Sequence, residues 1–223
     1  MKKLFTLFLC TFSSISCFCQ LGQDYNVRSL KVDVKKANFN YNKSIEGSAF
    51  LEEDFTDGIF YIKNGDPTER KTRLNLFEKS FEFKEKDVSL LVVPNSVDSI
   101  RYKNSIYVFI KFDYNDREEV QVLKRIARTT TGGVFEFREV IFNDAVSAKA
   151  FQDPIPAKFE QLDLVYVLEF KAKVVALSTI ARLYKAFPEQ ETELKNYVKM
   201  NNVKKNDPEK LKELLKFMEQ IIH

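Results

Sequence analysis

The chain has 223 residues, with 35 basic and 32 acidic side chains, one histidine and three cysteines. This length is sufficient for a hydrophobic core without covalent cross-links, and the near-balanced charge argues against a general nucleic-acid-binding surface or a polybasic membrane patch. The only histidine is the last residue, His223, so a Ser-His-Asp triad and a histidine-rich zinc site are excluded.

The N-terminus, residues 1–19, has the layout of a secretory signal peptide. Two lysines precede an apolar stretch at 4–15, and small residues occupy the −3 and −1 positions of a cleavage site before Gln20. The stretch is too short to span a membrane. We therefore expect a periplasmic or extracellular protein. A lipoprotein anchored at Cys17 is the less favoured alternative, because Ser14 stands where lipid attachment normally requires leucine.

All three cysteines lie within the predicted signal peptide, so the mature chain has no thiol for a disulfide or a nucleophile. Removal of its two lysines leaves 33 basic (35 minus 2) and 32 acidic residues, a formal charge of +1. We expect no nucleic-acid partner and no transmembrane segment in the mature chain. The sequence has no phosphate-binding GxxxxGK[ST] loop and no GxGxxG motif, which leaves nucleotide binding unsupported.

Residues 20–46 are expected to form a linker or an edge strand, because Leu30, Val32 and Val34 alternate with polar residues. An antiparallel β domain is then predicted over residues 47–142. Alternation is clearest at 80–84, where Phe81 and Phe83 are expected on a buried face and Glu82 and Lys84 in water. Other expected strands are 59–63, 72–77, 88–93, 106–112, 120–126 and 134–142. This spacing predicts a meander closing into a small barrel or sandwich.

Residues 143–161 are expected to form a connecting loop. The region 162–223 begins with a predicted hairpin, 162–170 and 173–177, and the apolar period then changes from two to 3.6. Ser178 is expected to cap a first helix that ends at Pro188, and a second helix is expected over 191–200. Asp207 and Pro208 begin a third helix with a long apolar stripe. The chain is thus predicted to be α+β, with three C-terminal helices packing on the β domain.

Two charged clusters are candidate sites. Glu52, Glu53, Asp54 and Asp57 suit a calcium site or a general acid/base pair, but a solvated turn is the favoured interpretation. Arg125 and Arg128, beside a threonine-rich loop, could hold an anion, although ordinary surface cations are the favoured interpretation. We therefore assign no catalytic, cofactor-binding or metal-binding residue from the sequence, and expect no cofactor.

A set of short motifs recurs along most of residues 47–222. They are Gly47 with Phe50-Leu51 and Asp54-Phe55, Gly58, Asn64-Gly65, Leu74-Asn75, Glu82-Phe83-Lys84 and the segment 197–202, which reads Tyr-Val-Lys-Met-Asn-Asn. In these motifs the chain resembles a family of short exported proteins of unassigned function from Gram-negative bacteria. The resemblance implies a β-meander followed by C-terminal helices and brings no catalytic residue.

Three functions remain open. We favour an exported, non-catalytic binding or interaction protein of the bacterial cell envelope. The alternatives are a β-barrel carrier of an apolar ligand and, with less support, a hydrolase that uses carboxylates alone. The partner would accordingly be an unknown protein or an apolar ligand. A cavity lined by apolar side chains would favour the carrier, and a filled core together with a flat exposed apolar patch would favour the interaction protein.

Overall fold

The computed structural model describes residues 33–37, 39, 41, 45–86, 88–148 and 153–222. The predicted signal peptide, its cleavage site and most of the linker lie outside these residues. Within the described part of the chain, no helix combines the length and the apolar character needed to cross a membrane.

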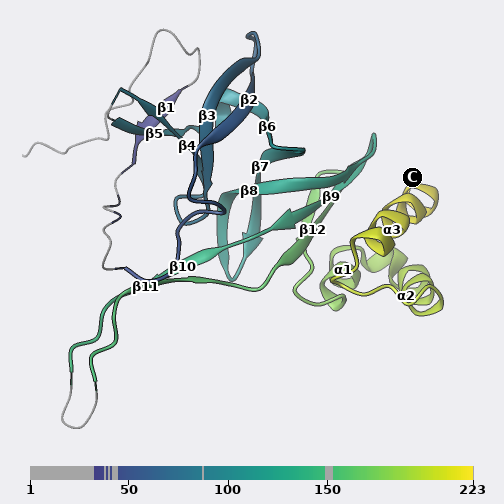
Figure 1. Ribbon diagram of the computed structural model, residues 1–223. Helices are drawn as coiled ribbons and strands as arrows, with labels where there is room; N and C mark the ends of the chain where they lie inside the picture. Colours follow the sequence, from purple (N-terminus) through teal and green to yellow (C-terminus); the bar gives the residue numbers. More distant parts are fainter. Residues whose placement is uncertain are drawn as a thin grey trace, which may run out of the picture.

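An antiparallel sheet of eleven strands carries most of the described chain (Figure 1). Its strand order is β1-β5-β4-β3-β2-β6-β7-β8-β9-β12-β13, and a small second sheet pairs β10 with β11. The bounds are β1 Val34–Lys36, β2 Thr56–Ile62, β3 Thr68–Asn75, β4 Ser80–Glu85, β5 Val88–Val92, β6 Val97–Tyr102, β7 Ser105–Tyr114, β8 Arg117–Arg128, β9 Gly132–Phe137, β10 Val140–Asn143, β11 Lys158–Gln161, β12 Val165–Phe170 and β13 Lys173–Ala176.

Short turns connect several of the neighbouring strands. Between β7 and β8, Asn115 and Asp116 both have positive φ, at 53° and 58°. Lys171 and Ala172 do the same between β12 and β13, at 47° and 65°. Two successive residues of positive φ are the geometry of a type I′ turn, whose twist matches that of the flanking strands. These turns make the sheet a meander, as the strand spacing predicted.

The predicted closure into a barrel or sandwich is wrong, because the sheet stays open. The strands β7, β8, β9, β12 and β13 curl so that β13 approaches β7, but no ladder forms between them. The first residues of β7, on the edge that β13 approaches, already pair with β6, and β13 has only four residues. Little of β7 is therefore available to β13. The long sheet therefore ends at β1 on one side and at β13 on the other.

Three strands also differ from the predicted pattern. β6 was not expected, because its buried residues Val97, Ile100 and Tyr102 do not alternate regularly, and a bulge at Tyr61/Ile62 of β2 accommodates them. The expected strand 134–142 is broken into β9 and β10, and β10 leaves the main sheet to pair with β11. The segment 143–161, predicted to be a loop, therefore begins with the last residue of β10 and ends with the whole of β11, which pairs with β10.

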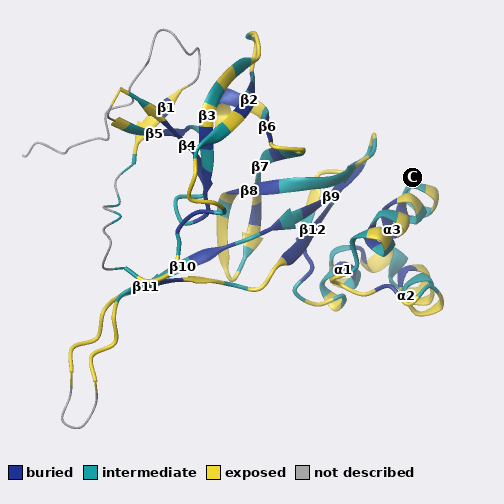
Figure 2. Ribbon diagram, viewed as in Figure 1, coloured by how far each residue is buried: buried dark blue, intermediate teal, exposed yellow. Residues whose placement is uncertain are grey.

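The described parts of the connection from β10 to β11, residues 144–148 and 153–157, are largely exposed and project from the body of the molecule (Figures 1 and 2). A bridge joins its two sides, with Val146 N–H donating to the Ile155 carbonyl at 2.9 Å and the reverse bond at 3.0 Å. Both of these side chains are exposed.

Three helices follow the sheet: α1 Ala181–Ala186, α2 Glu191–Met200 and α3 Pro208–Ile221, with 3-10 turns at Pro94–Ser96 and Pro188–Gln190. Asp207 caps α3 as predicted, its Oδ1 accepting from the Lys210 N–H at 3.1 Å. The predicted Ser178 cap is wrong. Ile180 occupies the N-cap position of α1, and the Ser178 hydroxyl instead accepts from Arg182.

The core has three parts (Figure 2). The first packs the faces of β1–β6 against the loop that begins at Gly47 and includes Phe60, Phe81 and Ile100. The second fills the curl of β7–β13, where Phe112, Leu123, Phe135, Phe137 and Val167 meet. The third lies between the helices and β9, β12 and β13 and contains Leu211, Leu214, Leu215 and Met218 of α3. The apolar stripe of α3 therefore packs on the protein's own sheet.

Candidate functional site

The candidate site is a groove between the end of β8 and the start of α3. The pairing of β7 with β8 ends at Tyr107↔Lys124, whereas β8 continues to Arg128. Among the described residues, no strand pairs with this edge of β8 beyond Lys124. The hairpin between β6 and β7 and the first turn of α3 form the walls, and the groove has a volume of about 550 Å³. We call it the β8 groove.

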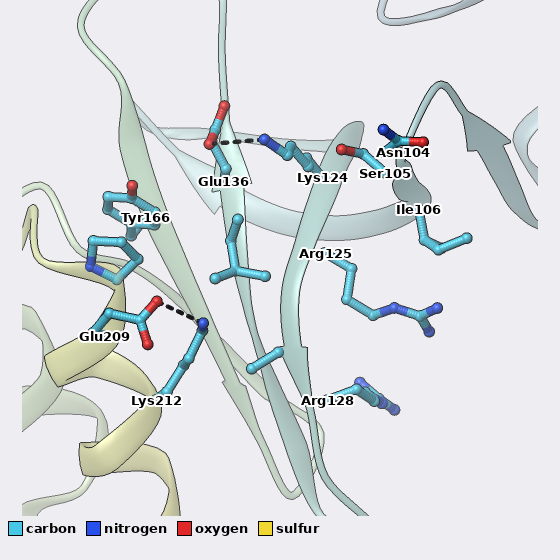
Figure 3. A pocket seen from close by; sticks show the side chains of 13 residues that line it. Asn104, Ser105, Ile106, Lys124, Arg125, Arg128, Glu136, Tyr166, Glu209 and Lys212 are labelled. Atoms are coloured by element: carbon cyan, nitrogen blue, oxygen red, sulfur yellow. Dashed lines mark hydrogen bonds and ion pairs between the residues drawn. The ribbon is translucent and has the colours of Figure 1, made fainter.

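Four cations and two carboxylates line the β8 groove, so its formal charge is positive by two (4 minus 2). Lys124 Nζ lies 3.7 Å from a carboxylate oxygen of Glu136, and Lys212 Nζ lies 2.7 Å from one of Glu209. Figure 3 shows both pairs, which belong to opposite sides of the groove. Lys212 is therefore neutralised by Glu209, whereas Lys124 shares the Glu136 carboxylate with Arg138, which lies 2.8 Å from it.

The two arginines of the groove differ in their partners. The Arg128 guanidinium forms an ion pair with Glu169 of β12. Arg125 is half-buried and has no ion pair or side-chain hydrogen bond within the part of the chain that the structure describes. In Figure 3 both arginines extend from β8 away from α3, on the side of Ile106. Arg125 is thus the cation of the groove whose five N–H donors remain available.

Tyr166 adds a neutral hydroxyl to the same groove. It comes from β12, and its ring is largely buried. Burial, and secondarily the Glu136 carboxylate, raise its pKa above the ordinary value, so the phenol stays protonated at neutral pH. Figure 3 places Tyr166 on the α3 side of β8 and Arg125 on the other side, so the guanidinium with its free donors is the group that can bind a carboxylate or a phosphate.

The sequence offered Arg125 and Arg128 as cations that could hold an anion, with ordinary surface cations as the favoured interpretation, and the structure places both in the β8 groove. The two arginines differ, however, because Glu169 neutralises Arg128 and no described side chain neutralises Arg125. The threonine-rich loop serves another purpose. Thr131 donates its hydroxyl to Glu219 of α3 at 2.5 Å, which ties the β8–β9 turn to the helix.

The acidic residues Glu52, Glu53 and Asp57 of the predicted cluster each pair with a different cation. Glu52 pairs with Lys103, and Asp57 pairs with Lys71 at 3.0 Å. Glu53 lies 3.8 Å from Arg73 and accepts a bond from Ser48. In the described parts of the chain, no three histidine, cysteine or acidic side chains gather as metal ligands would. This arrangement agrees with a solvated turn and brings no calcium site together.

Glu82 was expected in water and is buried, with 1% of its surface exposed. Arg73, its cross-strand partner, lies 3.2 Å away, and Asn75 donates to the same carboxylate at 3.4 Å. Asn75 also donates to the Tyr41 hydroxyl at 2.7 Å. The Arg73 guanidinium stacks 3.4 Å from the centre of the Phe50 ring. The loop that begins at Gly47 covers this side of β4, so the network anchors that loop and its charges satisfy one another.

The interior of the curled strands is filled by side chains, six of which are buried aromatic or branched residues. A small cavity of about 120 Å³ lies beside it, lined partly by Leu74, Leu76 and Tyr107. Pockets for drug-sized ligands typically measure about 300 to 1,000 Å³. These features give the apolar carrier no support.

Comparison of the chain with models of protein families, with curated proteins and with solved structures finds no match in any of the three. The resemblance to short exported envelope proteins therefore stays a prediction from sequence.

Proposed function

We propose that this protein is an exported, non-catalytic binding protein of the bacterial cell envelope, and that it holds an anionic partner in the β8 groove. The observation that carries the proposal is the half-buried Arg125, which lines the groove while its neighbours Lys124, Arg128 and Lys212 are paired with carboxylates. The cell-envelope location rests on the signal-peptide layout of residues 1–19.

An arginine that is half-buried and unpaired has lost hydration and can regain an interaction by binding an anion. A guanidinium remains charged at all physiological pH values and is planar, so it matches a carboxylate through two parallel hydrogen bonds. Partial burial of Arg125 removes some of its hydration, and no described side chain replaces it. An anionic partner would supply that missing interaction, and the positive formal charge of the groove would attract such a partner.

Binding of hexaglutamate tests this function. We expect the full chain to bind this peptide in isothermal titration calorimetry, more weakly as salt is added. Replacing Arg125 by Gln should weaken binding about 10- to 100-fold, because one charge-assisted hydrogen-bonding group contributes about 1.5 to 3 kcal/mol. The matched control is Arg182→Gln on α1, an arginine that lies outside the groove and should leave binding unchanged.

Two results would overturn the proposal. One is no detectable binding of hexaglutamate at low salt. The other is equal weakening by Arg125→Gln and Arg182→Gln, which would mean that the peptide responds to net charge and not to the groove. Far-UV circular dichroism of both variants checks that they retain the fold.

A further inference from the structure

A second pocket adjoins the β8 groove at the β6–β7 hairpin. It has a volume of about 500 Å³ and is lined by residues of β2, β3 and β6, among them Arg101. Asn104 and Ile106 line both this pocket and the β8 groove. The two spaces are therefore neighbours, and we call the second one the β6 pocket.

Two of the four charged residues that line the β6 pocket are already paired. Asp57 and Lys103 each form an ion pair with a side chain outside the pocket. Arg101 and Glu69 are exposed, and neither has an ion pair or a side-chain hydrogen bond within the described part of the chain. Arg101 is thus a second arginine beside the β8 groove whose N–H donors remain available.

The sheet register places the two free arginines on one face of the sheet. Arg101 of β6 is the cross-strand partner of Ile106 of β7. Continuing the β7–β8 register by one residue from its last pair, Tyr107↔Lys124, sets Ile106 beside Arg125, and Figure 3 shows the Arg125 side chain on the side of Ile106. Cross-strand neighbours project from the same face, so Arg101, Ile106 and Arg125 form one row. Neighbouring strands lie about 4.8 Å apart, which sets the two arginine Cα atoms about 10 Å apart.

We propose that the β8 groove and the β6 pocket together bind an acidic peptide segment through two carboxylates about 10 Å apart, one on Arg125 and the other on Arg101. The inference rests on the proposed function and defines its ligand. An apolar residue between the two acidic ones would cover Ile106, which separates the two arginines. Beyond Arg101 the row continues to Ile59 and Glu69, and the free Glu69 carboxylate would repel a further acidic group. The cationic part of the row therefore ends at Arg101.

Two other kinds of anion match this row less well. Tyr166 is the only aromatic side chain among the described residues that line the groove and the pocket, and it lies on the α3 side of β8 (Figure 3). A single-stranded nucleic acid would thus find no aromatic surface in the row on which to stack its bases. A small inorganic anion has no apolar part to cover Ile106. An acidic peptide supplies both the two charges and the apolar contact.

The test compares a peptide that carries two carboxylates with two peptides that carry one. The peptides are Glu-Pro-Pro-Glu, Gln-Pro-Pro-Glu and Glu-Pro-Pro-Gln, with acetylated and amidated ends. A polyproline II segment has three residues per turn and rises about 3.1 Å per residue, so its first and fourth side chains share a face about 9 Å apart. This spacing is close to that of the two arginines.

We expect the full chain to bind the diacid at least about fivefold more tightly than either monoacid in isothermal titration calorimetry at low salt, because the second contact is intramolecular. In Arg101→Gln this advantage should fall to about twofold, the statistical factor for a ligand with two equivalent carboxylates. The matched control is Lys103→Gln, which removes a cation of the same pocket that Glu52 already neutralises and should preserve the advantage. Far-UV circular dichroism checks the fold of each variant.

The outcomes separate this inference from the proposed function. If Arg125→Gln weakens hexaglutamate while the diacid keeps its advantage in Arg101→Gln, the anion site is confined to the β8 groove, and only the inference fails. If no acidic peptide binds, both fail. Equal losses in Arg101→Gln and Lys103→Gln would assign the effect to net charge and overturn the two-arginine site.

Three further measurements bear on the ligand. Glu69→Gln should tighten binding of the diacid, because it removes a repelling carboxylate, and weaker binding would contradict the proposed row. Binding of inorganic phosphate that is weakened by both Arg101→Gln and Arg125→Gln would mean that the two arginines converge on one small anion. Tighter binding of a single-stranded oligonucleotide than of any peptide would also overturn the acidic-peptide proposal.

Discussion

Replacing Leu215 of α3 by Ala should strongly destabilise the fold. Its side chain is 0% exposed and packs in the cluster between the helices and the sheet. Its Cδ1 atom lies 3.1 Å from the position that a side-chain carbon on Gly132 of β9 would occupy. The helix therefore sits against β9 with no spare room, and the strand cannot easily move inward to fill a space left by a shorter side chain.

The expected cost follows from two contributions. Leu→Ala removes roughly three carbon groups, and each buried group contributes about 0.8 kcal/mol of transfer free energy. The cavity left behind adds about 24 cal/mol for each cubic ångström that does not collapse. Because Gly132 and its neighbour Glu169 are already in close contact, we expect little collapse at Leu215. The free energy of unfolding should therefore fall by about 3 to 5 kcal/mol.

The assay is equilibrium urea unfolding followed by far-UV circular dichroism, since the chain has no tryptophan. The matched control is the same substitution at Leu164, which is 37% exposed and should cost less than about 1 kcal/mol. Removing the α3 cap by Asp207→Ala should fall between them, at about 1 kcal/mol. If Leu215→Ala costs no more than Leu164→Ala, the packing of α3 on the sheet is refuted.

Three other predictions concern the buried charge, the buried phenols and export. Glu82→Ala should cost about 3 to 5 kcal/mol in urea unfolding, because it removes the buried carboxylate beside the Arg73 guanidinium. The double variant with Arg73→Ala should be no less stable than the single one, and additive losses would contradict the pair. Burial raises the pKa of Tyr41 and of Tyr107 from 10 to about 12, so the folded state holds these protons more tightly and stability should fall as pH rises from 10 to 12. Absorbance at 295 nm should show that some tyrosines, Tyr41 and Tyr107 among them, ionise later than free tyrosine in the folded protein, and titration of every tyrosine near pH 10 would contradict this. N-terminal sequencing of exported protein should begin at Gln20, whereas an intact Met1 or a lipid on Cys17 would reject the predicted cleavage.

Features set by neighbouring residues could be predicted from the sequence. Asp207 and Pro208 define the start of α3 because an N-cap carboxylate and a proline at the first helical position act within one turn. The apolar stripe of α3 indicates a buried face because its period is that of a helix. The meander likewise follows from strand spacing, since turns such as Asn115-Asp116 depend on two residues.

Features set by distant residues were decided only by the tertiary structure. Glu82 alternates as a solvent-facing residue should, yet the loop carrying Phe50 covers it and Arg73 satisfies it. Strand β11 has no strong pattern of its own and exists because β10 leaves the main sheet to pair with it. Closure of the barrel depended on whether β13 could reach a free edge of β7, which no local pattern encodes.

The candidate site also combines features set by neighbouring residues with features set by distant ones. The sequence placed Arg125 near the end of an expected strand and Arg128 three residues later, in a threonine-rich loop, as cations that could hold an anion. Which of them is free depends on Glu169, which comes 41 residues after Arg128 and lies beside it only because β8 and β12 both pair with β9. Spacing along the chain determines which groups are present, and pairing between distant strands determines which of them remain available to a partner.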